Sequence, residues 1–303
     1  MYDIAIIGAG PAGLTAGIYA RRAGKSAVIF ESSGIGGQIA QAGHIANYPA
    51  CPDILGIDLS NAMYEQAEKL GCDFAFDAVT GIERIDGGFN VKGEYESHEA
   101  KTVIIATGAY CRHLGVEGEE RLIGRGVSYC AVCDGAFYRN KEIIVVGGGN
   151  SALEDAVYLT AYAKKVTLIH RRDEFRADKA VIEETLKNPR IQTVMNARVV
   201  EIIGEDAVSA VKVAHNDGIS ETVPTDGIFI AVGREPKNRA FASLISLDES
   251  GYVKADERCL TTCDGIFVAG DCRTKEIRQL TTATSDGTVA ALAAVAYLKK
   301  IES

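Results

Sequence analysis

The chain has 303 residues, of which 47% are hydrophobic, and a formal net charge of −9. This length and apolar content can fill two domain cores, and the acidic balance argues against nucleic acid and anionic membrane surfaces as partners. No stretch reaches the ~18 apolar residues that cross a bilayer. The chain enters an expected strand at once, so we expect no signal peptide and a cytoplasmic location.

The first third of the chain has the pattern of a β-α-β unit followed by shorter elements. An apolar run over residues 3–8 indicates a buried parallel strand, 12–22 has the apolar spacing of a helix, and 26–30 indicates a second strand. Glycines at 34–37 mark a loop. The elements expected next are a helix over 54–70 and strands near 74–76, 88–91 and 102–106.

The same pattern returns in the middle of the chain. A charged connection over 115–125 precedes a second β-α-β unit, which spans about 142–170. The elements expected after it are a helix over 177–186, further strands, a strand at 227–233, a strand near 265–269 and a last helix over about 280–300. The pattern predicts an α/β fold of two Rossmann-like nucleotide-binding domains, in which the second (111–240) is inserted into the first (1–110 and 241–303).

A glycine motif lies where the first strand meets the first helix. Gly8, Gly10 and Gly13 have the spacing of a dinucleotide-binding turn. Such glycines permit the tight turn, the approach of a pyrophosphate to the backbone and close packing of helix on strand. Glu31 ends the second strand, where a carboxylate can accept from ribose hydroxyls. We interpret the motif as a nucleotide site, and its position alone leaves FAD and NAD both open.

Two further segments are candidates for the same nucleotide. Gly36, Gly37 and Gln38 follow the acidic residue, and Asp271 follows the late strand near 265–269. A carboxylate there can bond a ribityl hydroxyl at the head of the last helix. The alternative is that Asp271 only caps that helix.

The second glycine motif lies 139 residues after the first, without a gap. It consists of Gly147, Gly149 and Ala152. The counterpart of Glu31 is His170, and the arginines Arg171, Arg172 and Arg176 follow it. An acid there would repel a 2′-phosphate, whereas arginines bind it through charge-assisted bonds. Two such bonds would favour NADPH over NADH by about 10² to 10⁴. The alternative is a solvated basic patch.

A Cys-x-x-Cys pair precedes the second β-α-β unit. Cys130 and Cys133 are close enough in sequence for their sulfurs to cycle between disulfide and dithiol, and Asp134 can give or take the proton. The alternative is half of a zinc site, with Cys259 and Cys263 as the candidate second pair, but we expect no metal. The other cysteines are expected to be small apolar fillers: Cys51, Cys72, Cys111 and Cys272.

Together these motifs resemble the low-molecular-weight thioredoxin reductases, in that family's order and over nearly the whole chain. The segments that carry the resemblance are 8–13, 36–38, 47–49, 106–108, 130–134, 147–152, 170–176, 270–271 and 278–279. The resemblance implies non-covalently bound FAD in the first domain, NADPH as donor in the second, thioredoxin as acceptor and a homodimer. It also implies that Cys133 faces the flavin, Cys130 attacks the acceptor's disulfide and Asp134 donates the proton.

The candidate cofactor-binding residues follow from the motifs and from the resemblance. They are Gly8, Gly10, Pro11, Ala12, Gly13, Glu31, Gly36, Gly37, Gln38, Asn47, Ala106, Thr107, Gly108, Asp271, Arg278, Gln279, Leu280, Gly147, Gly149, Asn150, Ser151, Ala152, His170, Arg171, Arg172, Arg176, Gly233 and Arg234. Two departures stand out: Asn150 lies where an acidic residue is common in the family, and Cys272 where a small aliphatic residue is common.

Three other functions stay open. The same chemistry can serve a glutaredoxin-like protein or a peroxidase component. A relative can take electrons from ferredoxin or act as a dithiol oxidase, although the arginines argue against both, and a flavin-bound redox sensor needs no turnover. Because the dithiol precedes the second β-α-β unit by a few residues, it belongs to the inserted domain, and we expect that domain to rotate on the connections near 110–116 and 236–241.

Overall fold

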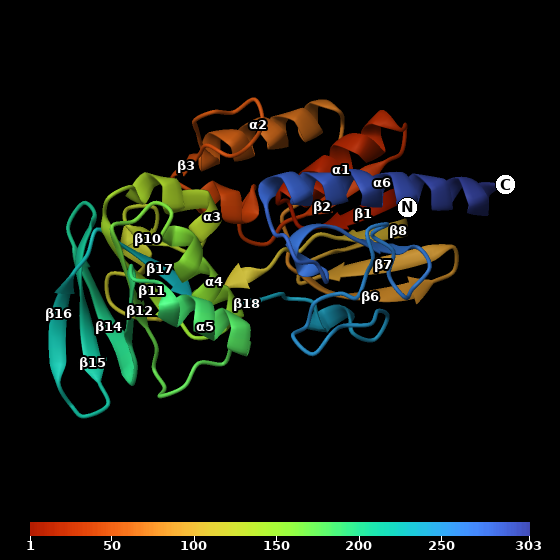
Figure 1. Cartoon of the computed structure of the whole chain (residues 1–303). Coiled ribbons are helices and arrows are strands. Elements are labelled where there is room, and N and C mark those ends of the chain that lie inside the picture. Colours follow the sequence, from red (N-terminus) through yellow and green to blue (C-terminus); the bar gives the residue numbers. More distant parts are fainter. The chain divides into compact units, whose positions relative to one another are not determined.

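The computed structural model describes residues 1–303 (Figure 1). The chain divides into two compact units, one formed by Met1–Tyr110 with Glu235–Ser303 and the other by Cys111–Arg234. One unit is therefore interrupted by the other. At the two crossings, β9 (Tyr110–Cys111) and β18 (Arg234–Glu235) form a two-stranded ladder, so the first unit resumes at residue 235, a little before the expected 241.

The first unit is built on a seven-stranded sheet with the order β5-β2-β1-β8-β7-β6 and with β19 beside β8. The bounds are β1 (Tyr2–Ile7), β2 (Ala27–Phe30), β5 (Asp73–Ala75), β6 (Val79–Ile85), β7 (Gly88–Gly93), β8 (Ser97–Ile105) and β19 (Ile266–Val268). The strands β1, β2, β5, β8 and β19 are parallel, and β6 and β7 are antiparallel additions. Every residue of β2 is buried, as expected for a parallel strand covered on both faces.

Helices cover one face of this sheet (Figure 1). They are α1 (Pro11–Arg22), α2 (Gly56–Lys69) and α6 (Leu280–Glu302), and one apolar core joins them to β1 and β2. The backbones of α1 and α6 approach closely at Gly287, which has no side chain. A Cβ there would lie 2.2 Å from the carbonyl oxygen of Ala12. A second core on the opposite face joins the sheet to residues 241–255. Short elements complete the unit: β3 (His44–Ile45), β4 (Ile54–Leu55) and 3₁₀ turns at 37–41, 239–241 and 270–272.

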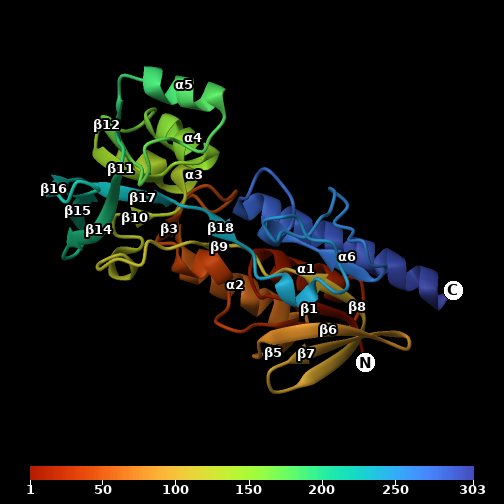
Figure 2. The ribbon, with the colours of Figure 1, turned by 90° about the horizontal axis from the view of Figure 1, so that it is seen from below.

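The second unit has a five-stranded parallel sheet with the order β10-β17-β11-β12-β13. The strands are β10 (Val127–Ser128), β11 (Glu142–Gly147), β12 (Lys165–Ile169), β13 (Ile191–Val194) and β17 (Gly227–Ala231). Helices α3 (Ala131–Asp134), α4 (Asn150–Leu159) and α5 (Lys179–Lys187) lie on one side (Figure 2). On the other lies an antiparallel sheet of β14 (Ala197–Gly204), β15 (Val208–His215) and β16 (Ser220–Pro224). A 3₁₀ turn at 120–122 precedes β10, and another at 135–138 follows α3 directly.

The predicted α/β class is confirmed, and both glycine motifs join a strand to a helix. No helix of the described chain is long and apolar enough to span a membrane. Several elements differ from the expectation. The strand β6 and the one-turn helix α3 were not expected, and the helix expected over 54–70 begins at Gly56, after the short strand β4. The antiparallel sheet β14–β16 was expected only as unspecified strands.

Candidate active site

The first glycine turn connects β1 to α1. Gly8 has a φ of +112°, which glycine adopts without strain, and a Cβ at Gly13 would lie 1.8 Å from the carbonyl oxygen of Gly8. At Gly10, by contrast, a Cβ would have no neighbour within 4 Å. No side chain caps α1. The turn is therefore packed beneath and open above the N-terminus of α1, which is the arrangement that a pyrophosphate needs.

Glu31 holds this turn in place. Its carboxylate accepts from the backbone N–H of Ala9 at 2.9 Å, of Ser33 at 2.8 Å and of Gly34 at 3.1 Å, and the side chain is buried. The residue expected to bind a ribose thus also orders the glycine turn and the loop after β2. Nearby, Gln38 donates from its side chain to the carbonyl oxygen of Ala109, which ties the loop at 36–38 to the segment between β8 and β9.

The turn after β19 is ordered by side chains from elsewhere in the first unit. Arg278 donates to the carbonyl oxygens of Asp271 (3.3 Å) and Arg273 (3.4 Å), and its guanidinium lies over the ring of Tyr252. Asp271 itself lies in the 3₁₀ turn 270–272 and does not cap α6. The interpretation of Asp271 as a helix cap is therefore wrong.

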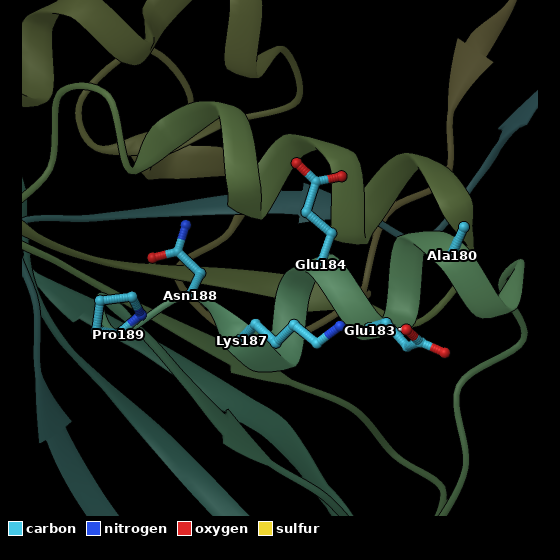
Figure 3. Close-up of a pocket in the computed structure, with 6 residues that line it drawn as sticks. All are labelled: Ala180, Glu183, Glu184, Lys187, Asn188 and Pro189. Atoms are coloured by element: carbon cyan, nitrogen blue, oxygen red, sulfur yellow. Dashed lines mark hydrogen bonds and ion pairs between the residues drawn. The ribbon is translucent and has the colours of Figure 1, made fainter.

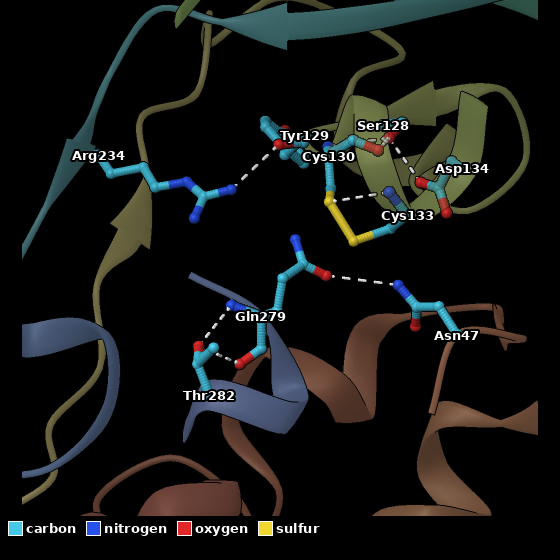
Figure 4. Close-up of a disulfide and its surroundings, with 9 residues drawn as sticks. All are labelled: Asn47, Ser128, Tyr129, Cys130, Cys133, Asp134, Arg234, Gln279 and Thr282. Atoms are coloured by element: carbon cyan, nitrogen blue, oxygen red, sulfur yellow. Dashed lines mark hydrogen bonds between the residues drawn. A yellow bond between two sulfur atoms is a disulfide. The ribbon is translucent and has the colours of Figure 1, made fainter. Parts of the chain in front are cut away.

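Gln279 is the residue that caps α6. It forms a reciprocal capping box with Thr282, whose hydroxyl accepts from the backbone N–H of Gln279 at 3.1 Å. Asn47 donates to the side-chain oxygen of Gln279 at 3.4 Å (Figure 4). The fold thus brings Asn47 and Gln279 together from opposite ends of the first unit's chain.

A buried asparagine joins three of these segments. Asn238 is fully buried and accepts from the hydroxyl of Thr107 at 2.8 Å. Its amide donates to the carbonyl oxygens of Cys272 at 2.9 Å and Gly251 at 3.0 Å. Nothing in the sequence singled out this residue, yet it links the carboxyl end of β8 to the turn after β19.

A second buried group lies at the same turn. Asp286 of α6 accepts from Arg273 Nε at 2.8 Å, from Lys275 Nζ at 2.9 Å and from the backbone N–H of Gly270 at 3.0 Å. Arg273 is 1% exposed. Burial alone would raise the pKa of Asp286, but the bonds from Arg273 and Lys275 outweigh it and hold that pKa below its ordinary value.

The second glycine turn connects β11 to α4. No side chain caps α4, so its first N–H groups remain available. The turn packs on His170, because a Cβ at Gly148 would lie 2.1 Å from the imidazole. His170 is buried, its ring lies against that of Phe175, and burial lowers its pKa. The imidazole is therefore neutral at physiological pH and supports the turn from below.

Residues 170–176, here called the arginine segment, lie beside this turn. The backbone N–H of Arg176 donates to the carbonyl oxygen of Gly148 at 2.6 Å, and Arg176 pairs with Gly149 as an isolated β-bridge. Arg171 and Arg176 are exposed and Arg172 is half-buried. None of the three guanidinium groups forms an ion pair within the chain, so their charge is available to a ligand.

Cys130 and Cys133 form a disulfide at the one-turn helix α3, with their Cα atoms 5.3 Å apart (Figure 4). The two sulfurs are therefore bonded to each other, which argues against the zinc alternative. The backbone N–H of Cys133 donates to Cys130 Sγ at 3.2 Å. A donor at this sulfur would stabilise a thiolate on Cys130 after reduction.

Asp134 lies at the end of the same helical turn. The hydroxyl of Ser128 donates to its carboxylate at 2.5 Å and accepts from the backbone N–H of Cys130 at 3.1 Å. Burial raises the pKa of Asp134, and the bond from Ser128 only partly offsets that effect. The raised pKa makes this carboxyl hold its proton more readily than an exposed aspartate does, which suits it to exchanging a proton beside the disulfide.

The residue before the disulfide is held by a buried carboxylate. Glu119 is 1% exposed and accepts from the Tyr129 hydroxyl at 2.7 Å. It also accepts from the backbone N–H of Leu114 at 3.0 Å and of Gly115 at 2.7 Å. Arg234 donates to the carbonyl oxygen of Tyr129 at 3.5 Å. The charged connection is thus ordered around Glu119, which the sequence did not indicate.

Three of the remaining cysteines share one kind of environment. Cys72, Cys259 and Cys272 are buried, and burial raises their pKa to about 11, about 12 and about 11 respectively. The Cys272 thiol donates to the carbonyl oxygens of Ala269 and Ile105. These thiols are unreactive fillers.

A surface hollow beside α5 carries no comparable chemistry (Figure 3). Its charged residues are Glu183, Glu184 and Lys187, and two of them, Glu183 and Lys187, form an exposed ion pair one helical turn apart at 3.3 Å. No titratable groups converge there, so we assign it no function.

Comparison with known proteins places this arrangement in a family. The profile of the pyridine nucleotide-disulphide oxidoreductases matches residues 2–287. The chain belongs to this family. It is 45% identical to a thioredoxin reductase from Listeria innocua, covering 100% of this chain and 95% of the relative. It is 44% identical to a thioredoxin reductase from Bacillus subtilis, covering 100% and 96%.

A solved structure agrees with the sequence relatives. The thioredoxin reductase from Streptococcus pyogenes superposes with a TM-score of 0.96 at 44% identity, covering 99% of both chains. Within its family the chain therefore groups with the thioredoxin reductases, as the sequence motifs predicted. It is an oxidoreductase, and membership of the family implies the use of a flavin and a pyridine nucleotide.

Proposed function

We propose that the protein is an NADPH-dependent thioredoxin-disulfide reductase with FAD as its resident cofactor. The observation that carries this proposal is the Cys130–Cys133 disulfide on the unit that also bears the exposed arginine segment. The other unit contains the first glycine turn, where Glu31 takes the place of His170 and serines stand in place of Arg171 and Arg172. Two nucleotide sites of different selectivity and one redox-active disulfide are the parts that such a reaction requires.

FAD would be held in the first unit. Its pyrophosphate would lie on the N–H groups at the start of α1, above Gly10, where the backbone is open. Glu31 Oε2 accepts only the bond from Ala9 and would take a ribose hydroxyl as well. The turn at Asp271, which Arg278 holds, would contact the ribityl chain. The other candidate contacts are Gly36, Gly37, Gln38, Asn47, Ala106, Thr107, Gly108, Gln279 and Leu280. When bound, FAD would accept two electrons from a hydride donor and pass them to a disulfide.

NADPH would be held in the second unit. The turn at Gly147 and Gly149 and the uncapped start of α4, with Asn150, Ser151 and Ala152, would bind the pyrophosphate. Arg171, Arg172 and Arg176 would bind the 2′-phosphate, and His170 would support the turn. Gly233 and Arg234 follow β17, whose last residue, Ala231, pairs with Gly147 of the glycine turn. We therefore expect a preference for NADPH of at least about a hundredfold.

The reduced pair would then transfer its electrons by thiol–disulfide exchange. Cys130, whose sulfur already receives the N–H of Cys133, would attack the acceptor's disulfide as a thiolate and form a mixed disulfide. One acceptor sulfur would leave in this step as a thiolate and take up the proton that Cys133 gives up. Cys133 would next attack Cys130 Sγ, re-form the internal disulfide and release the acceptor as a thiolate. Asp134, bonded to Ser128, would supply the proton that this thiolate takes up.

The names of the relatives support thioredoxin as the acceptor over a glutaredoxin-like protein or a peroxidase component. A purified sample should be yellow and should oxidise NADPH when oxidised thioredoxin is added. Cys130→Ser should still bind FAD and NADP⁺ but should lose turnover. A colourless protein that turns over without FAD would overturn the proposal, and so would turnover that persists in Cys130→Ser.

Two further parts of the proposal concern assembly and motion. A homodimer is expected from the family, and sedimentation equilibrium at micromolar concentration tests it, because a monomer would contradict it. We also propose that the second unit rotates on the crossings at β9 and β18 during turnover. A reversible crosslink between the two units should stop turnover only while it is closed.

A further inference from the structure

Backbone and side-chain contacts fasten the arginine segment to the second glycine turn. The backbone N–H of Arg176 donates to the carbonyl oxygen of Gly148, and this bond belongs to the β-bridge between Arg176 and Gly149. Two more hydrogen bonds join Asn150 and Asp178. Asn150 Nδ2 donates to Asp178 Oδ2 at 2.9 Å, and the backbone N–H of Asp178 donates to Asn150 Oδ1 at 2.7 Å. The segment is thus tied to the turn both at Arg176 and two residues later.

The two residues of this pair begin two different helices. Asn150 is the first residue of α4, and Asp178 is the N-cap of α5. An aspartate at an N-cap commonly accepts from its own helix, but the Asp178 carboxylate makes no such bond. It is bonded to Asn150 instead, and it forms no ion pair with Arg176. The carboxylate is therefore used to join the two helix starts, and the charge of Arg176 stays available.

From this geometry we infer that Asn150 and Asp178 are positioning residues for coenzyme selection. The pair holds the backbone of Arg176 beside the glycine turn, so that its guanidinium meets the 2′-phosphate of a nucleotide whose pyrophosphate lies on α4. This inference rests on the proposed function, because it deepens the NADPH preference proposed above. An amide can donate to the Asp178 carboxylate, whereas a carboxylate at position 150 would repel it.

The inference separates two effects of changing Asn150. If Asn150 acted only by contacting the pyrophosphate, its replacement would weaken the binding of nucleotides with and without a 2′-phosphate by the same factor. If it acts through Asp178 on the arginine segment, the loss falls on the ligand that carries the 2′-phosphate. Adenosine 2′,5′-bisphosphate and 5′-AMP differ only in the 2′-phosphate. The dissociation constant of 5′-AMP divided by that of the bisphosphate therefore measures the preference for this group.

The experiment is a calorimetric titration of the FAD-loaded, full-length protein with these two ligands. For Asn150→Asp we expect the ratio to fall by about three- to tenfold, the worth of one or two exposed hydrogen bonds. Asp178→Ala breaks the same pair from the other helix and should lower the ratio similarly, which covers the case in which Asn150→Asp does not fold. FAD content and far-ultraviolet circular dichroism report the folding of each variant.

The exchanged pair is the decisive control. In Asn150→Asp/Asp178→Asn the amide and the carboxylate change places, and both hydrogen bonds can form again. We expect the ratio to return to within about twofold of the wild type, although the added negative charge at position 150 remains. A ratio that stays low in the exchanged pair, or that never falls in the single variants, overturns the inference. A wild-type ratio near one instead overturns the proposed selection by arginines and the inference with it.

Discussion

Asp286 provides the sharpest test of how the first unit is held together. The change Asp286→Asn keeps the shape of the side chain but removes the charge that faces Arg273 and Lys275, which are 1% and 6% exposed in their side chains. Removing one partner of a buried ion pair costs about 3–5 kcal/mol, because the other charge is left uncompensated. The remaining bonds of Arg273, to Glu257 and to the Thr274 carbonyl, favour the lower end, so we expect about 3 kcal/mol.

The matched control is Glu257→Gln. Glu257 contacts the same guanidinium at 3.2 Å, but its side chain is 90% exposed. Exposed pairs contribute about 0–1 kcal/mol, so this variant should stay close to the wild type. The assay is urea unfolding monitored through the release of FAD, which reports on the first unit because FAD is proposed to bind there. Tryptophan fluorescence cannot serve instead, because the chain contains no tryptophan. A loss below about 1 kcal/mol for Asp286→Asn, or an equal loss for both variants, would refute the reasoning.

The pH dependence of this effect has a defined sign. Because the pKa of Asp286 lies below its ordinary value in the folded protein, its contribution is present above the unfolded pKa of about 3.9 and is lost as the pH falls through the folded pKa. The difference in unfolding free energy between wild type and Asp286→Asn should therefore be constant near neutrality. It should close only in strongly acidic solution, and a difference that grows as the pH falls would contradict the assigned charges.

Three further predictions concern the second unit and the thiols. Asp134→Asn should lower turnover about a hundredfold without destabilising the fold, since burial already disfavours the charged carboxylate; steady-state kinetics and urea unfolding measure the two effects, and unchanged turnover would rule out the proton role. Gly148→Ala, whose Cβ would lie 2.1 Å from the His170 ring, should weaken NADP⁺ binding in calorimetry, and unaltered affinity would contradict the packing. Iodoacetamide at pH 8 should leave Cys72, Cys259 and Cys272 unmodified in the native protein, as mass spectrometry can show, because burial raises their pKa values to about 11 or 12.

Local patterns were sufficient to predict the two β-α-β units. Each depends on a buried strand, a glycine turn and an amphipathic helix that follow one another in sequence, so neighbouring residues carry the whole signal. The Cys-x-x-Cys pair was found for the same reason. Its disulfide closes within one helical turn and needs no partner from elsewhere in the chain.

The supporting polar groups were not predictable in this way. Asn238 bonds residues that lie 131 and 34 positions away, and Glu119 bonds a tyrosine hydroxyl across the charged connection. Asp286 is paired with Arg273 only because α6 packs against the turn after β19. Each of these groups looks like an ordinary surface residue in sequence, since burial depends on tertiary packing that a local pattern does not contain.

His170 illustrates the same limit within a recognised motif. Its position after the second strand identified it as a candidate nucleotide contact. The structure buries the ring against Gly148 and leaves Arg171 and Arg176 exposed. Sequence spacing gives the place of a side chain along the strand, but it does not give the direction in which the side chain packs.

An anaerobic titration with NADPH tests the central claim most directly. If electrons pass from NADPH through FAD to the Cys130–Cys133 disulfide, the wild type should take up two hydrides per chain and gain one pair of thiols that react with a disulfide dye. In Cys130→Ser, a single equivalent of NADPH should bleach the flavin, and the number of thiols that react with the dye should not increase. Equal uptake by the two proteins, or reduction by NADH as readily as by NADPH, would contradict the account.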